Sequence, residues 1–220
     1  MSGLSNSPKL IKGGLVLVDP VSGAIRRVIT LQYNPDSLSR TLQIQGAGDG
    51  GDRSEALRLK GPPQETIKLE AEIDATDRLE FPGQKDNEAT VALGIHPQLA
   101  TLEAIAYPSA AALIANDALA ARGTIELVPM QSALTLFVWS SQRIVPVRIT
   151  DFSVTEEAFD PALNPIRAKV SLGMRVLSVD DLGFRHRGGS LYMAYLRAKE
   201  GLIGKAPAAS LSNLGLSGIP

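Results

Sequence analysis

The sequence predicts a mainly β fold with a helical insert, in the α+β class, and three patterns lead to this prediction. Apolar and polar residues alternate over residues 66–74 and again over residues 166–176, which is typical of strands that bury one face. Apolar residues at helical spacing lie between these stretches, after Pro97 and again after Ser109. A further helical pattern follows residue 190, so we also expect a helix near the C-terminus.

Length and charge narrow the class of protein. The chain has 220 residues, 44% of them hydrophobic, which suffices for one large domain or for one domain with an appendage. Lysine and arginine number 22 against 23 aspartates and glutamates, so no global basic field exists to attract nucleic acid or an anionic membrane. No apolar run approaches the roughly 18–20 residues of a spanning helix. We therefore expect no nucleic-acid binding and no direct membrane insertion.

Residue types that bind metals are scarce. Cysteine is absent, which excludes disulfides and thiolate metal sites, and the two histidines, His96 and His186, nearly exclude a multi-histidine site. We expect neither a metal nor a cofactor. The N-terminus lacks the charged start and apolar stretch of a secretory signal, so we expect the protein to be made and assembled in the cytoplasm.

The N-terminal part predicts a polar arm followed by a β-hairpin. Residues 1–13 form the arm, residues 15–18 predict a strand, and a turn is expected at Gly23. Residues 26–33 alternate as the partner strand, which ends before Pro35 because proline cannot continue a sheet ladder.

Two polar loops flank the clearest short strand. Residues 46–52 are glycine-rich and predict an exposed, flexible loop, and residues 77–87 predict a second polar loop. Between them, residues 66–74 place four apolar side chains on one face and charged side chains on the other.

Helical signals occupy the middle of the chain. Pro97 suits a first helical turn, and apolar residues recur at helical spacing until Pro108. Ser109 is placed to cap a second, alanine-rich helix that stops at Gly123.

The next segment predicts two strands and a long antiparallel hairpin. Residues 124–128 and 133–139 predict the strands, and the second has large side chains on both faces. The hairpin covers residues 145–176, and its apolar positions change phase near Asp151, as a β-bulge would require. Its second strand keeps period two over residues 166–176, so we expect one buried and one polar face.

The C-terminal segment has a different character. Residues 190–205 predict an amphipathic helix, and the tail to Pro220 predicts an extended segment that docks on another subunit. We expect the core to be complete without the helix. The predicted divisions are an N-terminal arm (1–13), a β-barrel domain (14–182), and a C-terminal helix with an extended docking tail (183–220). The candidate interface residues are Trp139, Leu191, Tyr195, Leu202, Leu214 and Leu216.

No motif predicts an active site. A GxGxxG pattern at residues 46–51 has the spacing of a dinucleotide fingerprint, but a turn rather than a helix N-terminus follows it. The acidic residues between 74 and 88 lie on a polar strand face and in a loop, which is typical of a solvated edge. No nucleophile pattern accompanies His96 or His186. We therefore expect a protein that is not an enzyme.

Several segments, in chain order, carry a resemblance to one family. Residues 31–40 are LQYNPDSLSR, and residues 61–70 are GPPQETIKLE. The others are the acidic loop at 74–77, HPQL at 96–99 with Tyr107-Pro108, ALTLFVW at 133–139, and FDPALNPIRAKV at 159–170. Together they resemble the tube proteins of contractile injection systems, whose signature is "QFNPESLSR", over about residues 14–180.

This resemblance implies a structural role in a phage-tail-like particle. Family members have two antiparallel sheets forming a tail-tube-like β-barrel with a flanking helix, and six copies close a ring. Many form the baseplate ring, or tube initiator, between the spike and the inner tube, and they carry a C-terminal LysM domain. Nothing after Leu182 has the pattern of LysM, so the helix and tail are expected to take over part of its tethering.

The resemblance also implies partners. These are other copies in a homo-hexameric ring, the spike or hub protein, the inner-tube protein and baseplate wedge proteins, in a particle that is released or membrane-anchored. An alternative within the same class is the repeating inner-tube subunit itself, which copy number per particle would distinguish. An alternative from another class is a small hydrolase or ligand-binding β-barrel, which loss of turnover or ligand binding on mutating His96 would support.

Overall fold

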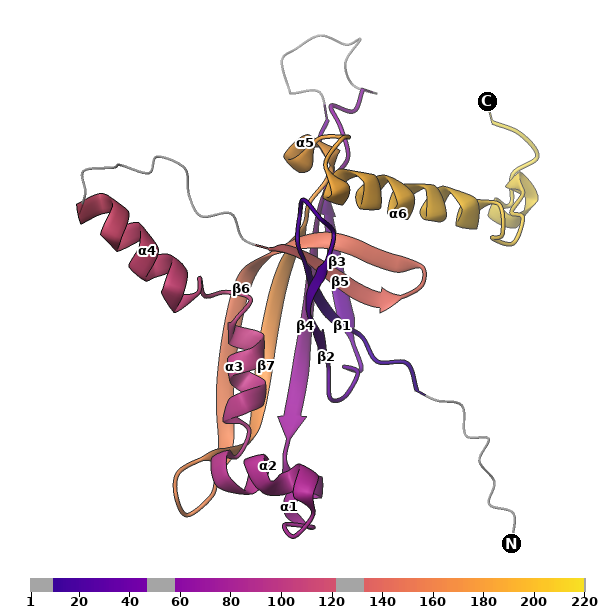
Figure 1. The fold of residues 1–220 in the computed structure, drawn as a ribbon. Helices are drawn as coiled ribbons and strands as arrows, with labels where there is room; N and C mark the ends of the chain where they lie inside the picture. The colour runs from indigo at the N-terminus through magenta and orange to yellow at the C-terminus, as the bar shows by residue number, and fades with distance from the viewer. Residues whose placement is uncertain (1–9, 47–57, 122–132, 220) are drawn as a thin grey trace, which may run out of the picture.

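Seven strands form one antiparallel sheet in the computed structural model, which describes residues 10–46, 58–121 and 133–219 (Figure 1). The sheet order is β2-β1-β5-β6-β7-β4-β3, so β2 and β3 are its edges. The strands are β1 (Gly14–Val18), β2 (Ile25–Thr30), β3 (Leu38–Gln43), β4 (Gln64–Asp74), β5 (Leu134–Ser140), β6 (Arg143–Phe159) and β7 (Pro165–Val176). The strand expected at 124–128 and most of the expected arm and glycine-rich loop lie outside the described residues.

The sheet is rolled but open, so the expectation of two sheets closing into a β-barrel is wrong for the described part of the chain. Within it, β2 and β3 form no ladder with each other. β2 ends at Thr30, and the chain then crosses the end of β4 before β3 begins. At this crossing the Gln32 side-chain amide donates to the Asp74 carbonyl at 2.6 Å and accepts its N–H at 3.1 Å. Two hydrogen bonds from one side-chain amide thus join this border of the sheet, whereas a closed barrel would have a ladder of backbone hydrogen bonds there.

Asn34 holds the same crossing from the other side. Its side-chain oxygen accepts the N–H of Gly13 at 2.8 Å, and its Nδ2 donates to the carbonyl of Ile11 at 2.9 Å. The N–H of Leu31 donates to the carbonyl of Gly13 at 2.9 Å. The partner strand therefore ends three residues earlier than expected, because these residues pair with the segment before β1 and not with a neighbouring strand.

The long hairpin has the predicted register change. In the β6–β7 ladder Ile149 pairs with Met174, but the next pair is Asp151 with Gly173, so Thr150 is the extra residue of a bulge. The predicted buried face of β7 is confirmed. Its core side chains are Ala168, Val170, Leu172, Met174 and Val176.

The bulge explains why residue 173 is glycine. A Cβ at this position would lie 2.6 Å from Oδ2 of Asp151 and 2.9 Å from its Cβ, which is closer than real atoms pack. We expect Gly173→Ala to lower the free energy of unfolding by about 1–3 kcal/mol, measured by urea denaturation, because the bulge must shift. Adding Asp151→Gly should recover most of this loss. Ser171→Ala, on the same face of β7, is the matched control, and an equal loss there would contradict the packing argument.

Helices occupy the two ends of the sheet and one of its faces. They are α1 (Thr76–Leu79), η2 (Lys85–Asn87), α2 (Glu88–Leu93), α3 (His96–Glu103), α4 (Ala110–Ala121), α5 (Val179–Leu182), α6 (Arg187–Ile203) and η3 (Leu211–Leu214). The predictions of α3, α4 and α6 are confirmed, including the Ser109 cap, whose hydroxyl accepts the N–H of Ala112 at 3.2 Å. The expected loop at 77–87 is wrong in part, since it contains helical turns, and the tail forms a short 3-10 turn.

Two helices complete the core. α3 lies along the long hairpin and buries Leu99 and Leu102, while α6 crosses the opposite end of the sheet and buries Tyr192 and Tyr195 (Figure 1). These tyrosines belong to the same apolar cluster as β4, β6 and β7. The expectation that the core is complete without the C-terminal helix is therefore wrong.

Candidate interaction surfaces

A cluster of polar and charged side chains anchors the middle of α6 to the sheet. Glu65 of β4 is 4% exposed and lies in phase with the apolar face of its strand. Its Oε1 accepts from Arg40 Nε at 2.7 Å, and its Oε2 accepts from Lys199 Nζ at 3.3 Å. The Tyr195 hydroxyl lies 3.2 Å from both Glu65 Oε1 and Arg40 Nη2. We call these four residues the Glu65 cluster.

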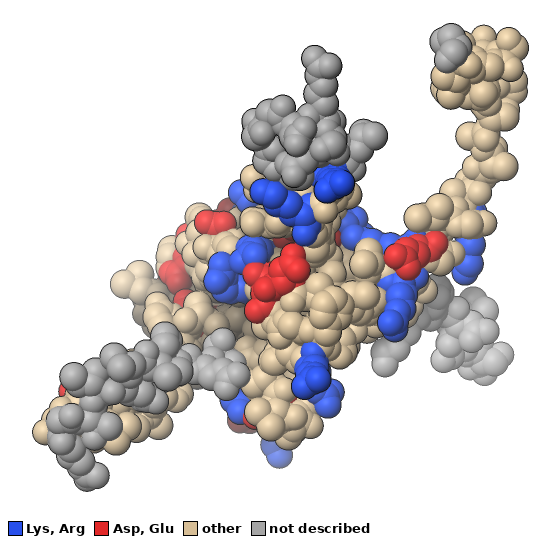
Figure 2. Space-filling model, turned by 90° about the horizontal axis from the view of Figure 1, so that it is seen from above, with Lys and Arg blue, Asp and Glu red and all other residues tan. Residues whose placement is uncertain are grey.

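The last turn of α6, residues 200–203, and the tail extend beyond this cluster. Beyond the cluster, Leu202 and Ile203 are exposed, and Ile203 is 74% exposed. In the tail, Leu214 and Leu216 are exposed on a segment without charged residues, which extends to the upper right of Figure 2. Three of the candidate interface residues, Leu202, Leu214 and Leu216, are thus placed where a partner can reach them.

The other candidate interface residues pack inside the chain. Tyr195 is buried, and Leu191 packs against the small apolar cluster of β1 and β5. Trp139 stacks on Phe137 with ring centroids 5.8 Å apart, and a Cβ on Gly13 would lie 2.5 Å from its ring. The structure therefore places these three residues against the core and separates them from the exposed group.

Helix α4 is an exposed apolar surface that the sequence reasoning did not single out. None of its residues is buried, and Leu113, Ile114 and Leu119 are exposed, Ile114 at 70%. Asp117 is its one charged residue. A helix that is apolar nearly all round is normally buried, and this composition was the signal that could have identified it. Figure 1 shows α4 projecting on the opposite side of the sheet from α6.

Both sheet edges also expose apolar side chains. β2 presents Ile25 and Val28, and β3 presents Leu42, with Ile44 immediately after it. Each edge strand is six residues long. Unpaired edges of this kind offer free N–H and C=O groups to another chain.

A further exposed apolar group lies at the end of the sheet that α1 and α2 cover. It comprises Phe81, Val91, Leu93, Phe159 and Leu163. The turn between β6 and β7 is held there by Asp160, whose Oδ1 accepts the N–H of Asn164 at 2.8 Å. The Asn164 side chain also donates to Asp160, and these hydrogen bonds lower the pKa of that carboxyl.

The outer face of the long hairpin is polar and of mixed charge. Glu157 accepts from Arg167 Nε at 3.3 Å and from Lys169 Nζ at 3.0 Å, and it raises the pKa of Lys169. Viewed from above, blue and red side chains are interspersed over the body (Figure 2). This pattern differs from the single-signed groove that nucleic acid requires.

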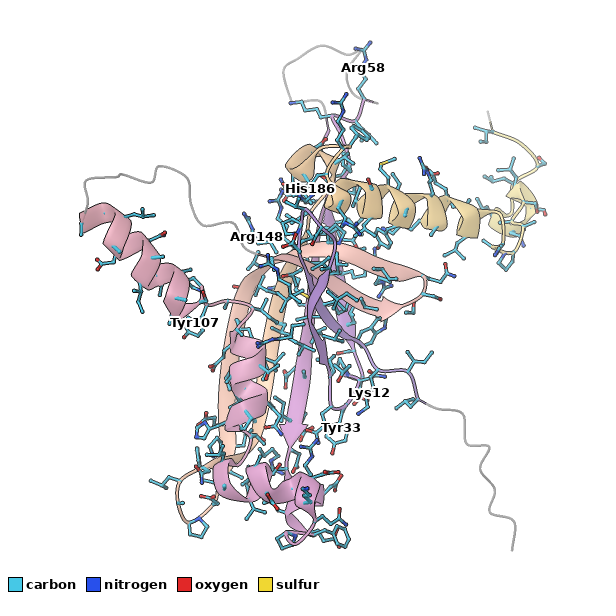
Figure 3. All side chains as sticks on the ribbon, in the orientation of Figure 1. Lys12, Tyr33, Arg58, Tyr107, Arg148 and His186 are labelled. Carbon is cyan, nitrogen blue, oxygen red and sulfur yellow. The ribbon has the colours of Figure 1, made fainter. Side chains whose placement is uncertain are left out.

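The two histidines are not brought together. His186 is the N-cap of α6, where its Nδ1 accepts the N–H of Gly188 at 3.1 Å (Figure 3). An open groove beside it is lined by Arg185 and Arg187. His96 is exposed in the first turn of α3. Among the described residues, no group of three or more His, Cys, Asp or Glu side chains is placed to hold a metal ion.

The segments that carry the family resemblance lie at joints between elements. Gln32 and Asn34 hold the crossing between β2 and β3, and Asp160 shapes the β6–β7 turn. Gly94 has a φ of +57° and packs directly against the carbonyl of Pro165, which also accepts the N–H of Ile95 at 2.8 Å. Each of these motifs therefore has a structural role within the chain itself.

The helices are short compared with the thickness of a bilayer. In that part of the chain, none has the length and apolar character needed to cross a membrane.

Comparisons with known proteins differ between sequences and solved structures. No protein-family model and no curated protein sequence matches the chain. A solved structure described as the tail of an empty GTA particle, computed with helical refinement and C6 symmetry, aligns with 10% sequence identity and a TM-score of 0.30. The alignment covers 75% of this chain and 90% of that one. At this TM-score the two folds are not shown to be the same, so neither fold nor function is inferred from it.

Proposed function

We propose that this protein is a non-catalytic structural subunit of a phage-tail-like contractile injection particle, forming the ring between the spike and the inner tube. The observation that supports it is the amount of apolar surface left outside the core. Among the described residues, 26 large hydrophobic side chains are exposed, against 24 hydrophobic residues that are buried. A subunit that works within an assembly keeps such surface for its neighbours.

The two sheet edges support a closed ring of identical copies. β2 and β3 each have one edge that forms no ladder among the described residues, and they are equally long and on opposite borders of one sheet. When β2 of one copy pairs with β3 of the next, every edge is satisfied, and the same contact repeats around the ring. The sequence resemblance supports six copies, and it supports the spike, inner-tube and baseplate wedge proteins as the other partners.

Copy number in the particle tests the proposal. The particles made by the producing cells are purified, and the chain is quantified by mass spectrometry with isotope-labelled peptides. Six copies per particle support the ring, whereas a number that scales with tube length favours the repeating inner-tube subunit. Absence from the particles, together with normal particles in a strain that lacks the gene, would contradict both.

The tail gives a second, independent prediction. Ending the chain after Ala206 removes residues 207–220, and those that the structure describes, 207–219, are all exposed, so we expect the free energy of unfolding to change by less than about 0.5 kcal/mol. Incorporation into particles should fall, because the apolar tail residues are lost as docking groups. Ending the chain after Leu182 is not equivalent, since it also removes Tyr192 and Tyr195 from the core.

A full-length variant tests the same docking with the tail in place but with two of its apolar side chains replaced by polar ones. The full-length variant Leu214→Ser with Leu216→Ser should fold normally and incorporate as poorly as the truncated chain. Normal incorporation of both variants would show that the tail does not dock.

A further inference from the structure

We propose that α4 of one copy docks on the second half of α6 of the neighbouring copy in the ring, an inference that rests on the proposed ring. Two helices of the same chain each leave an apolar surface without a partner. Those on α4 are Leu113, Ile114 and Leu119, and those on α6 are Leu202 and Ile203.

The position of the two helices favours contact between copies. α4 and the far end of α6 project from opposite sides of the sheet in Figure 1, and the view from above in Figure 2 agrees. They cannot meet within one copy in this arrangement. A surface on one side that fits a different surface on the other side is the head-to-tail contact from which rings are built.

Charge favours the same pairing. α4 carries a single charged residue, the exposed Asp117. Near the exposed end of α6, Arg197 and Lys205 outnumber Glu200, a net charge of +1, because Lys199 is already paired with Glu65. Two copies of α4 facing each other would instead place two carboxylates together, which disfavours an α4–α4 contact.

The size and shape of α4 and of the end of α6 also allow the two helices to pack against each other. α4 has 12 residues, about 18 Å at 1.5 Å per residue, and it is rich in alanine, so another helix can approach it closely. The exposed end of α6 has a small residue, Gly201, next to Leu202 and Ile203. The contact is too small to hold two copies together alone, so it works with the paired sheet edges, which bring the helices near each other.

Disulfide trapping tests this docking, and the absence of native cysteine makes each disulfide informative. Two full-length chains with tags of different size, one with Ile114→Cys and one with Ile203→Cys, are produced together in the cells that assemble the particle and are oxidised there. We expect the 114–203 disulfide to exceed the 114–114 and 203–203 products by about tenfold, because docking raises the effective concentration of that pair only. Val21→Cys, on the exposed β1–β2 turn, replaces Ile203→Cys in the control pair.

The outcomes separate this docking from the proposed function. If the 114–203 disulfide forms no faster than the control pair while particles contain six copies, the docking is wrong and the ring stands. A dominant 114–114 product would also overturn the docking, in favour of a symmetric contact. If the chain is absent from particles, the ring itself is wrong, and the docking that rests on it is wrong as well.

Discussion

Replacing Val170 by aspartate is expected to abolish cooperative folding. Val170 is fully buried in the middle of β7, between its cross-strand partners Ala71 on β4 and Val154 on β6. A carboxylate there would have no partner, and burial of an unpaired polar group costs about 2–7 kcal/mol. The free energy of unfolding of a whole domain is about 5–15 kcal/mol, so this one change removes a large part of it.

Urea denaturation followed by far-UV circular dichroism measures this effect. Thr155→Asp is the control, because residue 155 lies on the outer face of the same sheet, directly opposite Lys169. It should unfold at the native midpoint. A Val170→Asp chain that unfolds cooperatively at that same midpoint would show that this face of β7 is not part of the core.

The second large effect is expected at the Glu65 cluster. Arg40→Leu removes the closest cation from a glutamate that is almost completely buried, and Lys199 and Tyr195 remain as its partners. Removing one partner of a buried ion pair typically costs about 3–5 kcal/mol, because the other charge stays buried. We expect a loss at the lower end of this range, since Lys199 remains within 3.3 Å.

A second substitution shows how much of the lost free energy of unfolding comes from the unpaired buried charge and how much from lost packing. Adding Glu65→Gln to Arg40→Leu removes the charge but keeps a side chain that accepts hydrogen bonds, so most of the lost stability should return. Denaturation of the native chain, both single variants and the double variant completes the cycle. A double variant as unstable as the sum of its parents would show that the charge interaction is not what stabilises α6 on the sheet.

The sequence patterns predicted correctly those elements whose formation depends on residues close together in the chain. Alternation over residues 166–176 located β7 and its buried face, and the phase change near Asp151 located the bulge. β3 was missed because LSRTLQ has no clear alternation, and it is a strand because it pairs with β4. Closure was mispredicted for a similar reason, since the crossing depends on contacts of Gln32 with a residue 42 positions away.

For the interaction surfaces too, the sequence predicted what depends on nearby residues and missed what depends on contacts between distant segments. Leu214 was identified because the leucines of the tail are too sparse to form a core, and Leu202 because it belongs to the apolar stripe of the predicted helix; both are exposed. Tyr195 was assigned to an interface although it is buried, since helical spacing cannot tell which partner covers a stripe. Glu65 was not singled out, yet it stands two residues before Ile67 in a period-two strand, which places its side chain on the buried face.

The crossing at Gln32 also determines how stiff the rolled sheet is. A continuous ladder between β2 and β3 would set the radius of curvature, whereas here two hydrogen bonds to Asp74 join this border of the roll. Each contributes about 1 kcal/mol net. Leu31 and Ile73, on the two sides of this border, are buried in the same apolar cluster and add their packing to these hydrogen bonds. This border of the roll is therefore closed by one side-chain amide and by apolar packing, so Gln32 fixes the position of the chain between β2 and β3 relative to the end of β4.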